Sequence, residues 1–185
     1  MPRRTLAPAL VLLMAGLCAC DSPASPAVPP PPAAPSTSFG GTDRAWIEIN
    51  IAMNEELTPL LELAGEQSRD NAVKGIASQV NDVNVRDLTE LRALHDAAGL
   101  PAENPHKGMP MPGMVTPEVV TRAAAAEGAA FDQIFREQVR AHLDQGVKLA
   151  KSETTAGVEP RTKALAERMI SDRESLLPKF PPAVK

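Results

Sequence analysis

Apolar residues recur at three- and four-residue spacing through residues 42–180, and no stretch shows the alternation of a half-buried strand. This spacing gathers the apolar side chains of a segment on one face of an α-helix. We therefore expect an all-α fold. The chain has 185 residues, which is enough for one modest domain but not for two large ones.

The helix boundaries are marked by glycine, proline and capping residues. We expect four long helices at about residues 43–68, 71–98, 129–154 and 160–178, and a short one from Thr116-Pro117-Glu118 to about residue 127. Gly99 should end the helix at 71–98, Gly157 should end the helix at 129–154, and Pro59 predicts a kink in the helix at 43–68. Residues 99–115 contain four prolines and should form a loop. These elements fit an antiparallel four-helix bundle with a short extra helix.

The two halves of this region have similar patterns. Leu61-Glu62-Leu63-Ala64 is followed after a turn by Ile76-Ala77-Ser78-Gln79-Val80, and Val147-Lys148-Leu149-Ala150 is followed by Leu165-Ala166-Glu167-Arg168-Met169. Each half reads as a helical hairpin, which suggests two repeats packed face to face.

The N-terminus has the pattern of an export signal. Two arginines precede an apolar run over residues 6–17, which is too short to cross a bilayer as a stable helix. The end of the run resembles a bacterial lipobox, in which a small residue precedes the cysteine that receives the lipid. Cys20 fits because Ala19 precedes it, whereas Cys18 follows the bulky Leu17. We expect residues 1–19 to be a lipoprotein signal peptide and Cys20 to carry acyl chains such as palmitate. The alternative is a secreted protein cut near the same place.

Residues 20–41 should form a linker between this anchor and the helices. Seven prolines lie between Asp21 and Ser38, and Ala and Ser fill most of the gaps. A chain of this composition stays extended and does not bury a core. The expected domains are therefore the signal peptide, the lipid-anchored linker, a helical bundle over residues 42–180 and a tail over residues 181–185. The protein should be exported and held at a membrane on its extracytoplasmic face, with the inner or outer membrane left open.

Composition excludes several functions. The net charge is −4 and the isoelectric point is near 5.4, so a nucleic-acid partner is not expected. Cys18 and Cys20 are the only cysteines, which leaves the helical region without a thiolate metal site or a disulfide. Motifs of the H-E-x-x-H, G-x-x-x-x-G-K and G-x-S-x-G types are absent from the sequence. A ferritin-like di-iron centre needs two helical E-x-x-H pairs, which the sequence does not supply. We expect a protein that is not an enzyme.

One cluster has a chemical interpretation, the loop His106-Lys107-Gly108-Met109-Pro110-Met111-Pro112-Gly113-Met114. Thioethers are soft ligands that suit Cu(I), and an imidazole is a reasonable additional ligand. Met109, Met111, Met114 and His106 are therefore candidate copper ligands. The alternative is that these methionines fill the end of the bundle as adaptable apolar side chains.

The same segments resemble the DUF305 family of exported, ferritin-like four-helix proteins. Met111-Pro112-Gly113-Met114 and Gly128-Ala129-Ala130-Phe131-Asp132-Gln133-Ile134-Phe135 match the M-P-G-M and G-x-x-F-D-x-x-F patterns of the family, and residues 140–147 stand at its I-x-H-H-x-G-A-I pattern. DUF4142, another family of exported bundles, has a similar layout. The DUF305 resemblance implies a ferritin-like bundle and a link to copper handling. The paired histidines of the family are reduced to His142 followed by Leu143, so a site of four histidines does not carry over.

His142 stands on the apolar stripe of a long helix, where it could face Glu55 or Glu56 of the first helix. His142 and Glu56 are therefore candidates for the remnant of a metal site, and the alternative is a core histidine without a ligand.

Two functions remain open. One is an anchored protein that binds copper weakly through the methionine loop. The other is a metal-free module that binds another envelope protein, and the oligomeric state is open in both.

Overall fold

The computed structural model describes residues 38–180, which contain five α-helices and no strand. The helices are α1 (Gly41–Gln67), α2 (Asn71–Ala98), α3 (Pro117–Ala124), α4 (Ala129–Ala156) and α5 (Pro160–Leu176), and the short 3-10 helix η1 (Leu177–Lys179) follows. The all-α prediction is confirmed, with α3 ending three residues before the expected boundary. The predictions for the signal peptide, for Cys20, for nearly all of the linker and for the tail lie outside the described residues.

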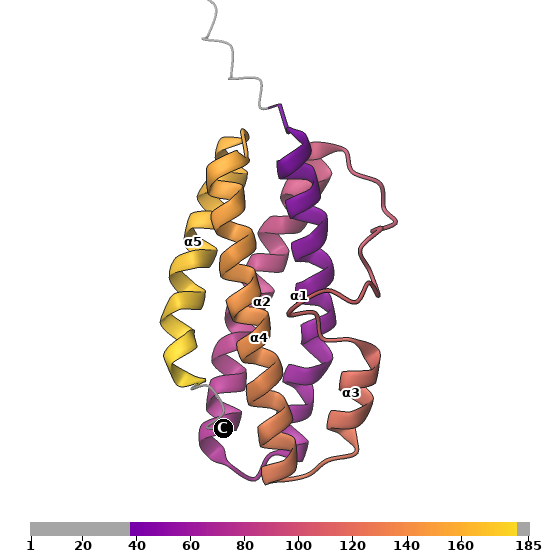
Figure 1. The fold of residues 1–185 in the computed structure, drawn as a ribbon, viewed down its shortest axis with the longest axis vertical. Helices are drawn as coiled ribbons and strands as arrows, with labels where there is room; N and C mark the ends of the chain where they lie inside the picture. Colours follow the sequence, from indigo (N-terminus) through magenta and orange to yellow (C-terminus); the bar gives the residue numbers. More distant parts are fainter. Residues whose placement is uncertain (1–37, 181–185) are drawn as a thin grey trace, which may run out of the picture. The chain divides into compact units, whose positions relative to one another are not determined.

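Four of the helices are long and run alongside one another (Figure 1). Helices α1 and α2 form one antiparallel pair, and α4 and α5 form another. Helix α1 also packs against α4, while α2 and α5 make a thinner contact. The loop after α2 passes along the outside of α1 and leads into α3, which packs against α1 and α4. The loop therefore follows the outside of α1 before the chain reaches α3 (Figure 1).

Local signals in the sequence account for the helix ends. Asp70 caps α2, because its Oδ1 accepts a hydrogen bond of 2.8 Å from the backbone N–H of Ala72. Gly99 ends α2 in the left-handed conformation, with a φ of 61°. Helix α1 continues through Pro59 as one helix, although proline removes a backbone donor there.

Two large apolar clusters and a small third one, Ala52, Met53 and Met114, fill the interior. In the large one nearer the end of α1, the rings of Phe131 and Phe135 stack at 5.8 Å, and Phe180 lies 6.3 Å from Phe135. The other large one contains Trp46 and Ile47 of α1 together with residues of α2, α4 and α5. Trp46 and Phe135 are therefore core residues, as the sequence pattern indicates.

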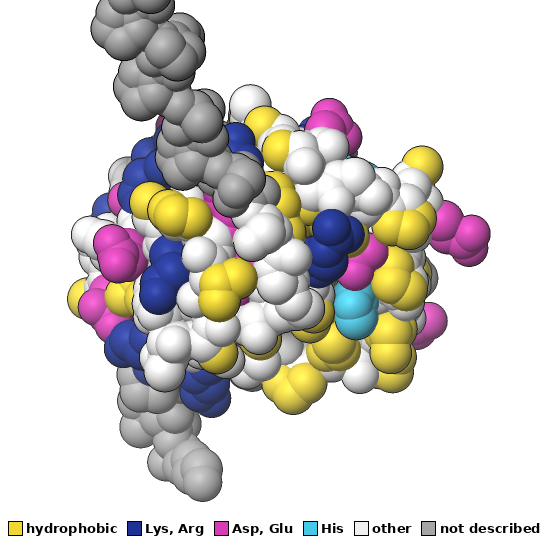
Figure 2. Space-filling view, turned by 90° about the horizontal axis from the view of Figure 1, so that it is seen from above, with side chains coloured by type: hydrophobic (Ala, Val, Ile, Leu, Met, Phe, Trp, Pro, Cys, Tyr) yellow, Lys and Arg dark blue, Asp and Glu magenta, His cyan; other side chains and the backbone are white. Residues whose placement is uncertain are grey.

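One end of the bundle has a mixed surface. Seen along the bundle from the end where α1 begins, basic, acidic and apolar side chains are mixed, and a histidine lies among them (Figure 2). Within residues 38–180, no helix combines the length and the apolar character that a membrane span requires.

Candidate functional site

The methionine loop is fixed against α1 by two hydrogen bonds. Asn104 Nδ2 donates to the carbonyl of Glu48 at 2.8 Å, and the backbone N–H of Gly108 donates to Glu56 Oε1 at 2.6 Å. Glu56, a candidate ligand from the sequence, therefore faces this loop. A second oxygen of the same carboxylate, Oε2, is buried and has no hydrogen-bond partner among the described residues.

The loop then turns inward at Gly113. Its φ is 77°, and a Cβ at this position would lie 2.7 Å from the carbonyl oxygen of Ala141 and 2.6 Å from Gln145 Cβ. Only glycine adopts this conformation without strain in so little space. The close approach to α4 directs the next residue, Met114, into the interior.

Met114 brings the loop into contact with a methionine of α1. Met114 is 5% exposed and clusters with Ala52 and Met53, and the partly buried Met111 packs against the same cluster. Met109 is 44% exposed and lies outside the cluster. The structure therefore groups Met53, Met111 and Met114, whereas the loop alone suggested Met109 as the third member. Met53 was missed because its place on the stripe of the first helix marks it only as a core residue.

His106 is the remaining candidate ligand in the loop. Its backbone N–H donates to Asn104 Oδ1 at 2.9 Å, and its side-chain Nδ1 is buried without a hydrogen-bond partner among the described residues. An unpaired imidazole nitrogen can accept a proton or a metal ion.

His142 lies in a different environment from Glu56. It is 1% exposed, and it lines a small internal cavity with Asn54, Asp87 and Arg173. Burial lowers the pKa of His142 to about 3, the positive charge of Arg173 acts in the same direction, and a backbone hydrogen bond with Gly113 opposes them. His142 is therefore neutral at ordinary pH.

The two glutamates considered as partners of His142 are engaged elsewhere. Glu55 Oε1 lies 2.7 Å from Arg92 Nη2, and Glu56 accepts from the loop. The described contacts therefore do not bring His142 and Glu56 into one site.

A buried arginine dominates the cavity beside His142. Arg173 Nη2 donates to Asn54 Oδ1 at 3.3 Å and lies 3.9 Å from Asp87 Oδ2. Burial raises the pKa of Asp87, while the charge of Arg173 acts against this rise. The guanidinium fits because residue 146 is glycine, where a Cβ would lie 2.0 Å from Arg173 Nη1. Sequence reasoning missed this residue, since an arginine in the last helix looks like a surface charge.

This cavity is a poor place for a metal ion. Its volume is about 10 Å³, room for at most one water molecule, and it already contains the positive charge of Arg173. Among residues 38–180, no group of three or more His, Cys, Asp or Glu side chains could hold a metal ion.

Comparison with protein families identifies the fold. The profile of the family described as Domain of unknown function (DUF305) matches residues 55–179, which is more than half of the chain. The chain belongs to the DUF305 family. The match includes the loop, most of the helical bundle, and Arg173 with Asp87 and His142, whereas Met53 and Asn54 precede it.

Solved DUF305 structures show the same fold. A DUF305 protein from Streptomyces coelicolor, whose name suggests secretion, matches with a TM-score of 0.67 and 19% identity over 75% of this chain and 89% of that one. A DUF305 fragment from Deinococcus radiodurans matches with a TM-score of 0.69 and 13% identity over 77% of this chain and 95% of that one. At these identities the likeness is one of fold alone. A comparison with curated proteins finds no match.

A second buried polar group of this DUF305 chain lies where α1 begins. Asp43, which precedes the family match, accepts hydrogen bonds from the backbone N–H groups of Gly40, Val158 and Glu159 at 2.6, 3.0 and 3.0 Å. Burial alone would raise the pKa of Asp43, but these bonds and the neighbouring Glu153 outweigh it and lower the pKa. Asp43 is therefore the ionised member of the group.

Glu153 is the neutral member. It is fully buried, and neither of its carboxyl oxygens has a hydrogen-bond partner among the described residues. Burial raises the pKa of Glu153 to about 8, and the neighbouring Asp43 adds to the rise. Glu153 is therefore protonated at neutral pH. Residue 157 must be small here, because a Cβ on Gly157 would lie 2.1 Å from Glu153 Oε1.

Proposed function

We propose that this DUF305 protein is an exported, lipid-anchored envelope protein that binds Cu(I) weakly and is not an enzyme. The observation that carries the proposal is the cluster of Met53, Met111 and Met114, which joins the loop to α1. Five methionines follow residue 20, and four of them lie in this loop or against it.

The chemistry of the cluster suits Cu(I). Thioethers are soft, neutral donors that prefer this ion to harder divalent ions. No cysteine follows Cys20, so thioethers are the softest ligands that the helical region can offer. His106 Nδ1 and Glu56 Oε2 are unpaired, buried atoms of the same region, and either could complete the coordination and balance its charge.

The anchor places this chemistry outside the cytoplasm. In our proposal the signal peptide is removed, Cys20 is acylated and residues 20–41 hold the domain away from the membrane. Two hairpins, α1–α2 and α4–α5, form the ferritin-like bundle that supports the loop. The name of the Streptomyces coelicolor relative, which suggests secretion, supports export of this chain as well.

Competitive titration tests the proposal. The full chain in detergent is titrated with Cu(I) against a calibrated chelator, under anaerobic and reducing conditions. We expect one saturable site that is lost in the triple variant Met53→Leu, Met111→Leu, Met114→Leu, because leucine preserves volume but removes the sulfur. Met169→Leu is the control, since Met169 is fully buried in the other apolar cluster.

Two outcomes would contradict the copper site. One is an affinity that the triple variant leaves unchanged, and the other is an equal loss in the Met169→Leu control. Met109→Leu and His106→Gln then measure whether the exposed side of the loop adds a ligand. Helical content by circular dichroism should be the same in all variants.

The burial of Met114 favours a second candidate, a metal-free module that binds another envelope protein. Packing alone would explain a buried methionine. In that case the protein should capture one specific partner from membrane extracts, in equal amounts with and without a copper chelator. Capture that requires copper would contradict this second candidate.

A further inference from the structure

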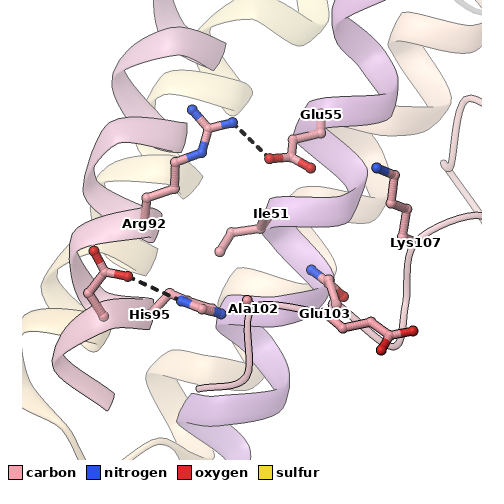
Figure 3. A pocket seen from close by; sticks show the side chains of 9 residues that line it. Ile51, Glu55, Arg92, His95, Ala102, Glu103 and Lys107 are labelled. Carbon is pink, nitrogen blue, oxygen red and sulfur yellow. Dashed lines mark hydrogen bonds and ion pairs between the residues drawn. The ribbon is translucent and has the colours of Figure 1, made fainter. Parts of the chain in front are cut away.

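A pocket lies between α1, α2 and the first part of the loop (Figure 3). Its volume is about 630 Å³, within the range of sites for small molecules. Ile51 forms part of its wall, and Glu55, Arg92, Glu103 and Lys107 surround it with charges of both signs. The pocket lies outside the methionine cluster.

The loop is held in place on both sides of the pocket. His95 Nε2 lies 3.0 Å from the carbonyl oxygen of Pro101, which fixes the start of the loop to α2. Asn104 is bonded to the backbone of Glu48 on α1, and Gly108 is bonded to Glu56. These contacts attach the loop to both helices on either side of the pocket, so the pocket is part of the folded structure.

The charges around the pocket are only partly paired. Arg92 Nη2 lies 2.7 Å from Glu55 Oε1, and His95 Nδ1 lies 3.4 Å from Asp96 Oδ1. Lys107 and Glu103 have no ion-pair partner among residues 38–180. Lys107 and Glu103 are therefore a positive and a negative side chain of the lining that no ion pair engages, and Asp96 is a second unpaired carboxylate whenever His95 is neutral.

We propose that this pocket binds a small zwitterion, of the class of free amino acids and short peptides with both ends unblocked. Lys107 and the outer edge of Arg92 would take the carboxylate, and Glu103 would take the ammonium group. Ile51 offers the only large apolar side chain of the wall to an aliphatic part of the ligand. The proposal is independent of copper binding, because it uses none of the methionines.

Calorimetric titration with three related probes tests the match of charges. The full chain in detergent, with a metal chelator present, is titrated with the dipeptide Ala-Leu, with N-acetyl-Ala-Leu and with Ala-Leu amide. The two blocked probes each lose one of the charges. We expect saturable binding of Ala-Leu and affinities at least about tenfold lower for both blocked probes, the loss of about one charged contact.

Substitutions locate the binding. Lys107→Ala should weaken Ala-Leu at least about tenfold and leave the affinity for Ala-Leu amide unchanged, because the amide lacks the carboxylate. Lys148→Ala is the matched control, since Lys148 is an exposed lysine on α4 without an ion pair in the described region. The proposal is overturned if Ala-Leu shows no heat of binding up to about 10 mM, if the blocked probes bind equally well, or if Lys107→Ala and Lys148→Ala have the same effect.

Discussion

The buried, protonated carboxyl of Glu153 should make the stability of the fold fall as the pH rises from acidic to mildly alkaline values. Folded Glu153 keeps its proton up to a pH of about 8, whereas its ordinary pKa is 4.5. Between these values the folded chain binds one more proton than the unfolded chain. Raising the pH therefore favours unfolding, and the stabilising effect of the neutral carboxyl is lost as the pH approaches the folded pKa.

The size of the effect follows from the same two values. The interval from 4.5 to about 8 corresponds to a change of at most about 5 kcal/mol in the free energy of unfolding. This is a large share of the stability of a small domain, about 5–15 kcal/mol. The loss should appear first where the pair acts, at the joint between the start of α1 and the turn from α4 to α5.

The variant Glu153→Gln isolates this contribution. Its amide has nearly the size and shape of the neutral carboxyl, but it has no proton to release in this pH range. We expect chemical denaturation of the wild type to show falling stability between about pH 5 and pH 9, and the variant to lose this part of the slope. The variant should be close to the wild type at the acidic end and more stable at the alkaline end.

The matched control is Glu174→Gln, which removes an exposed carboxylate that pairs with Lys151 at 2.8 Å. This change should leave the slope as it is, since an exposed pair contributes at most about 1 kcal/mol. Parallel pH profiles of the wild type and Glu153→Gln would refute the reasoning. The reasoning would also be refuted if Glu153→Gln were much less stable than the wild type at acidic pH, where the carboxyl of Glu153 and the amide that replaces it are both neutral.

Three further predictions concern the interior and are tested by chemical denaturation. Gly146→Ala should destabilise the fold by about 1–3 kcal/mol, because the new Cβ displaces Arg173. Gly75→Ala is the control, since residue 75 lies in open space on α2, and it should stabilise the fold by about 0.5–1 kcal/mol. Equal effects of the two substitutions would contradict the close fit of Arg173 against Gly146. Phe135→Ala should cost about 3–5 kcal/mol, and a loss near zero would mean that the aromatic cluster is not the core. The pKa of His142 is about 3 in the folded chain, below its ordinary 6.5, so the stability of the fold should decrease as the pH falls below 6.5. His142→Gln should make stability depend less on pH in this acidic range. An unchanged pH dependence would count against a buried neutral histidine.

The helices themselves could be predicted from the sequence, and the reason is local. Their apolar spacing, the cap at Asp70 and the stops at Gly99 and Gly157 act within a few residues along the chain. The one clear difference is the end of α3 at Ala124, where the chain turns toward α4 earlier than the composition suggests. Helix boundaries depend on such local chemistry, and only their last residues depend on packing.

The site was harder to predict, because its members are distant in sequence. The loop shows Met111 and Met114, but Met53 joins them only because Gly113 lets the loop approach α4 closely. Similarly, Glu55 and Glu56 could lie at the same level along the bundle as His142 by sequence spacing. In the structure, however, Glu55 pairs with Arg92 and Glu56 accepts a hydrogen bond from the loop. Adjacent residues on a helix point about 100° apart. The sequence does not show how one helix is rotated relative to another, so it does not show which of two neighbouring side chains faces a given partner.

The sequence by itself determined that this chain is built of helices, where most of them begin and end, and which family it belongs to. It did so because the periodicity of apolar residues and the family motifs are properties of neighbouring positions. Only the tertiary structure decided that Arg173 rests on Gly146 beside Asp87 and His142, and that Glu153 meets Asp43 across the bundle. Ionisation of these groups depends on burial and on the charges that folding brings near them, and neither is written in the local sequence.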